Sequence, residues 1–275
     1  MVMRALLVVL VVVGVARGQV AAPVVGASGA ACKVSEPDAM DGPIASPENH
    51  TVLYEDRDVR VLDVHSAPHT QEKMHTHARP AVMYIDSQGA GRYFTPEDMV
   101  GRSHPTDPSF KFRVFALKPE GLHATENTGD VPFHAIRVEF KHPGCSLDGA
   151  PVKALGPDDA VTAAPDFHTV IFENDDVRVL DVHGAPHAKE PMHTHAWPSF
   201  FYVVQDEPSL FFTPTQTDPK PGMFPPGMKI VAVGPTGPHW VEDVGDAPTH
   251  YIRFELKHAT PGEQHFGPKA ASGGQ

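Results

Sequence analysis

Two histidine-rich segments of nearly identical sequence carry the residue types that could do chemistry. Val59–Pro80 reads VRVLDVHSAPHTQEKMHTHARP, and Val177–Pro198, 118 residues further along the chain, reads VRVLDVHGAPHAKEPMHTHAWP. Each segment contains the triplet His-Thr-His. On a β-strand this triplet places both imidazoles on the same face, about 7 Å apart, because side chains alternate between faces. Two imidazoles that share a face can hold a metal ion.

The internal repeat extends beyond these segments and adds a third paired histidine to each unit. Pro119, Gly121 and His123 of the first unit correspond to Pro235, Gly237 and His239 of the second. A repeated constellation of two histidines plus one is difficult to explain as packing and is typical of metal ligation. We therefore predict two metal sites, formed by His75, His77 and His123 and by His193, His195 and His239.

The other paired histidines and glutamates have more than one interpretation. A histidine on an apolar strand face is more often a hydrogen-bonded core residue than a ligand. We give this core role to His50, His168, His65 and His183. His134 and His250 could orient the ligands or supply a fourth one. Glu72 and Glu190, three residues before the first ligand of each unit, could reach the metal or remain solvated loop carboxylates.

The predicted ligands require strands to position them, and the composition favours strands throughout. The 29 prolines and 23 glycines among 275 residues separate short runs of Val, Ile, Phe and Tyr. Near the end of the first unit, His134, Ile136, Val138 and Phe140 share one strand face, which we expect to point into the interior of the unit. Many short strands separated by turns indicate an all-β sandwich or barrel.

The amino-terminal segment predicts export. Met1–Arg4 is a short basic start, Ala5–Ala16 is an aliphatic run, and small residues precede a cleavage position after Gly18. We predict a signal peptide over residues 1–18 and a secreted or periplasmic protein that is free of the membrane after cleavage. A lipoprotein acylated at Cys32 is an alternative. Cys32 and Cys145 are the two cysteines of the chain, and an exported protein permits a disulfide between them.

The remaining chain divides into two units and their connections. We predict a flexible leader over 19–47, a first barrel over 48–145, a linker over 146–165, a second barrel over 166–260 and a flexible tail over 261–275. The formal net charge of −12 argues against a nucleic-acid or anionic-membrane partner, since phosphate binding needs a positive face. The expected partner is a small-molecule substrate, and a homo-oligomer is compatible with the sequence.

Together, the His-x-His and Pro-x-Gly-x-His motifs resemble the two motifs of the cupin superfamily. The resemblance covers residues 48–142 and 166–258, and two copies resemble a bicupin. It implies two tandem antiparallel jelly-roll barrels, each a double-stranded β-helix with a metal at its centre. Cupins also use a glutamate shortly after His-x-His, but that position falls near Ala81 and Ser199 here. The resemblance then implies three-histidine sites, as the cysteine dioxygenase and acetylacetone dioxygenase branches are thought to use.

A site of three neutral imidazoles leaves coordination positions open for water, dioxygen or an anionic substrate. Iron, copper, zinc, nickel and manganese all suit such a site, so we predict two divalent transition-metal ions per chain without assigning the element. The favoured function is a dioxygenase-like oxidoreductase that acts on a small organic or sugar-like substrate. The alternatives are a metal-assisted isomerase, hydrolase or lyase and a non-catalytic protein that binds metal or sugar.

The two units differ beside their predicted ligands. Arg79 follows the first His-Thr-His, whereas Trp197 follows the second, and Trp240 adjoins the third histidine of the second unit. We predict that Trp197 and Trp240 line a substrate pocket suited to sugar or aromatic rings. We predict that Arg79, with Arg92 and Arg102, favours a carboxylate or phosphate in the first unit.

Overall fold

The computed structural model describes residues 32–216, 218–222, 224, 227–259 and 265–266. The predicted signal peptide and the first part of the leader lie outside these residues. Nearly all of the ordered elements are β-strands, and two helices of four residues each complete them. No helix within the described residues is long and apolar enough to cross a membrane.

The first unit contains one short helix and ten strands. They are α1 (Gly42–Ala45), β1 (His50–Glu55), β2 (Val59–Ser66), β3 (Thr70–Gln71), β4 (His75–His77), β5 (Ala81–Ser87), β6 (Gly91–Thr95), β7 (Asp98–His104), β8 (Arg113–Leu117), β9 (Glu120–Asn127) and β10 (Phe133–Phe140). One sheet has the order β1-β2-β10-β5-β8, and a second has the order β3-β9-β6-β7, with β4 also paired to β9. All of these ladders are antiparallel.

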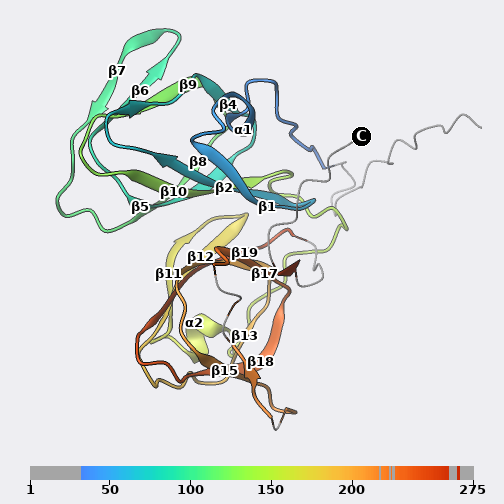
Figure 1. The fold of residues 1–275 in the computed structure, drawn as a ribbon. Helices are drawn as coiled ribbons and strands as arrows, with labels where there is room; N and C mark the ends of the chain where they lie inside the picture. The colour runs from blue at the N-terminus through green and yellow to red at the C-terminus, as the bar shows by residue number, and fades with distance from the viewer. Residues whose placement is uncertain (1–31, 217, 223, 225–226, 260–264, 267–275) are drawn as a thin grey trace, which may run out of the picture.

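The second unit repeats this plan. Its elements are α2 (Ala160–Ala163), β11 (His168–Glu173), β12 (Val177–Gly184), β13 (His193–His195), β14 (Ser199–Gln205), β15 (Ser209–Phe212), β16 (Lys220–Pro221), β17 (Ile230–Val233), β18 (Thr236–Asp243), β19 (Thr249–Leu256) and β20 (His265–Phe266). The sheet orders are β11-β12-β19-β14-β17-β20 and β13-β18-β15-β16. The predicted fold class, two tandem all-β jelly-roll barrels, is confirmed (Figure 1).

The segments predicted to be flexible are partly ordered. In the leader, the amide of Thr76 donates to the carbonyl of Met40 at 2.8 Å, and Asp41 is 1% exposed. Asp159 occupies the same place in the second unit, so each barrel begins before residues 48 and 166. In the tail, β20 pairs with β17. The predicted Cys32–Cys145 disulfide is confirmed, and it joins the leader to the segment that follows β10.

The strand faces of the first barrel are opposite to our expectation. Ile136 and Val138 belong to an apolar cluster that contains residues of both barrels, so their face of β10 packs against the second barrel. Arg137 and Glu139 occupy the other face and are almost fully buried inside the first barrel. The charged face of β10 therefore points into the barrel, where its side chains position the functional site.

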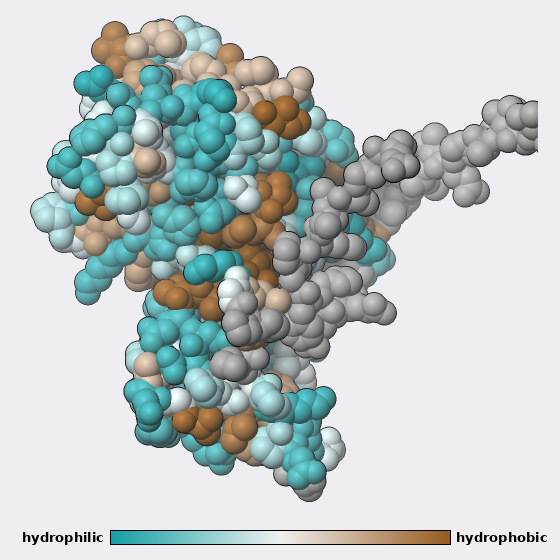
Figure 2. Space-filling view, viewed as in Figure 1, coloured by the Kyte–Doolittle hydropathy of each residue, from teal (hydrophilic) through white to brown (hydrophobic). Residues whose placement is uncertain are grey.

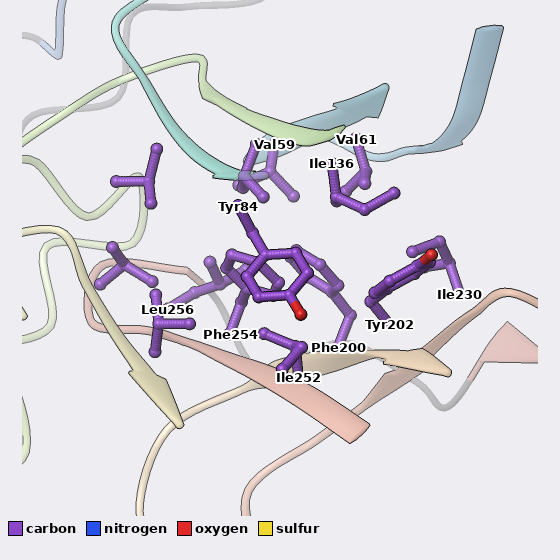
Figure 3. Packing of buried hydrophobic residues seen from close by; sticks show 14 of the residues in the cluster. Val59, Val61, Tyr84, Ile136, Phe200, Tyr202, Ile230, Ile252, Phe254 and Leu256 are labelled. Atoms are coloured by element: carbon purple, nitrogen blue, oxygen red, sulfur yellow. The ribbon is translucent and has the colours of Figure 1, made fainter. Parts of the chain in front are cut away.

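The two barrels share this apolar cluster (Figure 3). It is formed by one face of each large sheet, where Tyr84 lies 6.1 Å from Tyr202 and Phe200 stacks on Phe254 at 4.8 Å between ring centroids. In the space-filling view two lobes meet at a narrowed waist, where apolar side chains gather, whereas much of the outer surface is hydrophilic (Figure 2). The apolar residues of both large sheets thus form an interface between barrels.

Candidate metal centre

The three predicted ligands of each unit lie together inside its barrel. His75 and His77 extend from β4, and His75 is paired in register with His123 on β9. The ring centroids of His75 and His123 are 4.4 Å apart, and those of His77 and His123 are 5.6 Å apart. The second unit repeats these distances at 4.3 Å and 5.6 Å for His193, His195 and His239. All six side chains are buried.

A fourth histidine joins each group: His50 and His168 are buried and hydrogen-bonded, as we expected of core residues, and they also adjoin the predicted ligands. The first residue of β1, His50, lies 4.4 Å from His75 and 5.2 Å from His77 between ring centroids. One ligand nitrogen from each of these three rings lies within 4.8 Å of the others, and His168 forms the same kind of group in the second unit. His50 and His168 occupy equivalent positions of the repeat, and this was the sequence signal that they belong to the two histidine groups.

Hydrogen bonds fix the orientation of every imidazole in the first site. The Nδ1 atoms of His75 and His123 lie 2.8 Å from the carbonyl oxygens of Lys73 and Gly121. His50 Nδ1 lies 3.2 Å from a carbonyl oxygen, and His77 Nδ1 lies 3.0 Å from a carboxylate oxygen of Glu139. Since these oxygens only accept, each Nδ1 carries the proton, and each Nε2 keeps a lone pair for a metal.

The second site has the same set of anchors. Carbonyl oxygens lie 2.8 Å from Nδ1 of both His193 and His239 and 3.4 Å from Nδ1 of His168, and Glu255 lies 2.7 Å from Nδ1 of His195. The Nε2 atom of His195 is buried and has no hydrogen-bond partner among the described residues. A buried nitrogen lone pair without a partner fits a divalent transition metal, which would satisfy it.

Burial keeps these imidazoles neutral. Desolvation lowers the pKa of His50 to about 2, that of His75 to about 4 and that of His239 to about 3. It also lowers the pKa of His77 and His195 far below the usual range for histidine. The neutral form is the one that ligates a metal, so the clusters need no deprotonation at neutral pH.

Behind each cluster lies a buried chain of alternating charges. The Glu139 carboxylate that contacts His77 also accepts a 2.8 Å hydrogen bond from Arg60 Nε, and both terminal nitrogens of Arg60 donate to Asp41 at 2.7 and 2.8 Å. In the second barrel, Arg178 links Glu255 to Asp159 in the same way. These chains connect the ligand His77 or His195 to the residue just before α1 or α2.

Glu72 and Glu190 lie at the edge of the two clusters. An oxygen of Glu72 is 3.9 Å from His75 Nε2, and an oxygen of Glu190 is 3.8 Å from His193 Nε2. Burial raises the pKa of Glu72 to about 7 and that of Glu190 to about 8. Both side chains line the cavities described next, where a carboxyl group could exchange a proton with a bound molecule.

Each histidine cluster opens into a cavity of its own barrel. The cavity of the first barrel has a volume of about 310 Å³ and that of the second about 340 Å³, which is the size of a small-molecule site. The first is lined by Met83, Tyr93 and Phe115 beside the ligands. The second is lined by Phe201, Phe211, Phe224 and Tyr251.

The two tryptophans predicted to line the second cavity lie elsewhere. Trp240 follows His239 directly on β18, so strand alternation turns it to the opposite face, where it stacks on Phe212 at 5.1 Å. Trp197 is buried behind the site: its Nε1 donates to the carbonyl of Lys153 at 3.0 Å, and Arg178 lies over its ring at 5.0 Å. Neither side chain is among the described residues that line the cavity.

Arg79, predicted to bind an anionic substrate in the first unit, also lies outside the cavity. Its Nε donates to the carbonyl of Ser35 at 2.9 Å, and its Nη1 lies 3.6 Å from a carboxylate oxygen of Glu55 and 3.8 Å from one of Glu139. The guanidinium therefore holds the leader against the barrel wall. Arg92 does line the first cavity.

His134 and His250 are neither ligands nor neighbours of the clusters. Nδ1 of His134 is 2.6 Å from Asp86, and Nε2 of His250 is 2.8 Å from Asp181. The ring of His134 also lies 6.1 Å from that of Tyr202, which belongs to the other barrel. These histidines sit on the strand face that meets the neighbouring barrel, because they share it with the apolar stripe.

No protein-family model and no curated protein matches the chain. Among solved structures, it is similar to a cupin domain from Bordetella pertussis Tohama I, at 20% identity and a TM-score of 0.30 over 33% of this chain and 92% of that one. It is also similar to oxalate decarboxylase from Lactobacillus farciminis in complex with formate, at 14% identity and a TM-score of 0.43 over 89% of this chain and 88% of that one. For a variant of salicylate 1,2-dioxygenase from Pseudoaminobacter salicylatoxidans, the identity is 13%, the TM-score 0.40 and the coverage 72% and 71%.

Proposed function

We propose that each barrel binds one divalent transition-metal ion through imidazole Nε2 atoms and that the protein is a metal-dependent, dioxygenase-like oxidoreductase of small organic substrates. The observation that carries the proposal is the common orientation of the imidazoles. Every Nδ1 is held by an oxygen acceptor, so that the Nε2 lone pairs remain for a metal. A metal at this place would supply a Lewis acid or redox centre beside the cavity.

The residues of the chain supply the rest of the site. Glu139 and Glu255 hold one imidazole each in the required tautomer, and the barrel walls exclude bulk water from the clusters. The cavities leave room for a substrate next to the histidines. Iron, copper, zinc, nickel and manganese all suit a nitrogen-only donor set.

A metal-assisted isomerase or lyase is the second candidate, and one observation favours it. Glu72 and Glu190 are buried carboxyl groups that line the cavities within 4 Å of a ligand imidazole. Such a group can accept or donate a substrate proton without any oxidant. Oxygen uptake on addition of candidate substrates supports the oxidoreductase, whereas turnover without oxygen supports the second candidate.

Metal stoichiometry tests the claim that both candidate functions share, namely that each barrel binds a metal ion. Protein purified without chelator or nickel affinity should contain about two metal ions per chain by elemental analysis, because each barrel holds three buried histidines with ligand nitrogens within 4.8 Å of one another. Replacing His75 and His77 together by alanine should remove one ion and leave the other. One ion per chain in fully loaded wild-type protein would show that only one cluster binds metal, and none would refute the proposal.

We further propose that the protein is exported. The basic start and aliphatic run of residues 1–16 support this, as does the disulfide between Cys32 and Cys145, since such bonds persist in oxidising compartments. Intact-mass measurement of the exported protein tests it. The mass should correspond to a chain that begins at Gln19 without free thiols, and a full-length chain retained in the cytosol would contradict it.

A further inference from the structure

A buried arginine lines the cavity of each barrel, and the two arginines are partnered differently. Arg137 on β10 and Arg253 on β19 are 1% and 4% exposed by side chain and occupy equivalent positions of the repeat. Both line the cavity beside the histidine cluster. Burial lowers the pKa of Arg253 to about 10, so that this guanidinium remains charged at neutral pH.

In the first barrel a carboxylate of the chain pairs with this arginine. Arg137 Nη1 donates to Glu120 at 2.8 Å, and its Nε donates to Glu139 at 3.2 Å. Glu120 is the first residue of β9 and pairs in register with His77. Two carboxylates thus engage Nη1 and Nε of this guanidinium, whereas its Nη2 is buried without a hydrogen-bond partner among the described residues.

In the second barrel the corresponding carboxylate is absent. The residue that pairs in register with His195 is Thr236, so a hydroxyl group stands where Glu120 stands in the first barrel. Nε and Nη2 of Arg253 are buried and have no hydrogen-bond partner among the described residues. The carboxylate of Glu255 lies 3.7 Å from Nε, beyond hydrogen-bond distance. Two charged donors inside a cavity are costly unless an acceptor reaches them.

The walls around Arg253 are aromatic. Its guanidinium lies 4.7 Å from the ring centroid of Phe201, and Phe201, Phe224 and Tyr251 form a cluster with ring centroids 5.6–5.8 Å apart. The first barrel has Met83 and Ala135 at the positions of Phe201 and Tyr251. The second cavity therefore combines a guanidinium that can donate two hydrogen bonds with flat apolar surfaces.

We propose that the second cavity binds a small carboxylate with an aromatic or other flat apolar body. Its carboxylate accepts hydrogen bonds from Arg253, near Thr236, where the first barrel has the carboxylate of Glu120, and its body packs on Phe201, Phe224 and Tyr251. This assigns a substrate class to the second barrel and rests on the proposed function in taking the histidine cluster next to Arg253 as the reactive centre. It reverses the sequence-based expectation that the first unit prefers anions.

The described acidic residues that line this cavity leave Nε and Nη2 of Arg253 without a hydrogen bond. Glu190 and Asp243 also line the cavity, yet among the described residues no hydrogen bond joins either one to Nε or Nη2 of Arg253. A carboxylate ligand that approaches the guanidinium would form a paired, charge-assisted contact, which is the strong kind of hydrogen bond. A ligand could therefore accept the hydrogen bonds that Nε and Nη2 of Arg253 do not donate to the chain.

Calorimetric titration with benzoate, and with the neutral benzamide as a comparison, tests the proposal. Wild-type protein should bind one benzoate per chain and bind benzamide at least about tenfold more weakly. Thr236→Glu should weaken benzoate binding by at least about tenfold, because the new carboxylate pairs with Arg253 as Glu120 pairs with Arg137. Thr236→Gln is the matched control, since it adds the same bulk without charge and should retain much more of the affinity.

The proposal is overturned if wild-type protein binds no benzoate, if benzamide binds equally well, or if Thr236→Glu and Thr236→Gln behave alike. Titrations in zinc-loaded and in chelator-treated protein separate this inference from the proposed function. If zinc does not bind, but benzoate binds and is weakened more by Thr236→Glu than by Thr236→Gln, the metal proposal is wrong and the anion site is supported. If two zinc ions bind but benzoate does not, only the anion site falls.

Discussion

A histidine ligates a metal through the ring nitrogen that carries no proton, so the partner of the other nitrogen decides what the residue can do. In both clusters every Nδ1 faces a carbonyl or carboxylate oxygen, including that of His50. His65, by contrast, is half exposed, and its Nδ1 lies 3.0 Å from Asp63 on the strand face away from the barrel interior. Since an oxygen lies beside Nδ1 in both cases, burial separates the ligand candidates from His65, whose exposure contradicts the core role that we predicted for it.

The role of His50 as a ligand can be tested by replacement with alanine. We expect His50→Ala to weaken metal binding at the first site by at least about tenfold, because it removes one of the imidazole donors, and to leave the second site unchanged. Competition titration of zinc against a chromophoric chelator measures both sites. His65→Ala is the control and should bind two ions normally. Unchanged affinity in His50→Ala would make His50 a packing residue.

Strands and motifs were predictable from the sequence, but the direction of a strand face was not. The alternation in β10 separated Ile136 and Val138 from Arg137 and Glu139, yet both faces are buried, one against the other barrel and one around the site. A prediction based on hydrophobicity alone places the apolar face of β10 inside its own barrel. Here the interior carries charges, because they anchor the ligands.

The same alternation rule, applied strictly, would have corrected the prediction for Trp240. Trp240 adjoins a ligand in sequence, and adjacent residues on a strand face opposite ways. His50 was missed for a different reason: it stands 25 residues before His75, and only the antiparallel pairing of β1 with β2, and of β2 with β10, brings it inside. Contacts that depend on sheet order cannot be obtained from local spacing.

The segment before α1 is a structural part of the first histidine cluster, which a substitution that removes one carboxylate charge can test. Asp41→Asn should reduce the free energy of unfolding by on the order of 3 kcal/mol, because it leaves the buried Arg60 without its bidentate partner. It should also weaken metal binding at the first site only. Urea unfolding of metal-free protein and zinc titration measure the two effects. Glu36→Gln, at an exposed residue of the same segment, is the control and should change neither.

At the scale of the molecule, the two barrels pack against each other through a shared apolar core and are not independent domains on a linker. Residues of β2, β5 and β10 pack with residues of β12, β14 and β19 in one apolar cluster (Figure 3). The repeat in the sequence predicted two similar units but not this shared face, because a duplicated pattern carries no information on how its copies pack. The polar rim of the interface includes His134, Asp86 and Tyr202.

The interface should respond to pH through His134. The carboxylates of Asp63 and Asp86 raise the pKa of this histidine to about 9, and Asp86 also accepts a hydrogen bond from the hydroxyl of Tyr202 in the other barrel. A folded-state pKa above the unfolded value of about 6.5 gives stability that is fully present below pH 6.5 and is lost as the pH rises through 9. The loss for wild-type protein should be on the order of 2 kcal/mol, because the charged imidazole is only partly buried.

Urea unfolding of wild-type protein and His134→Gln at pH 6 and pH 9.5 measures this contribution. The glutamine variant keeps a hydrogen-bond donor but cannot titrate, so its free energy of unfolding should change less between the two pH values. His65→Gln is the matched control, since His65 pairs with the same Asp63 but is half exposed and should leave the wild-type pH dependence nearly intact. An equal loss of stability in wild-type protein and His134→Gln would show that His134 does not couple protonation to the packing of the two barrels.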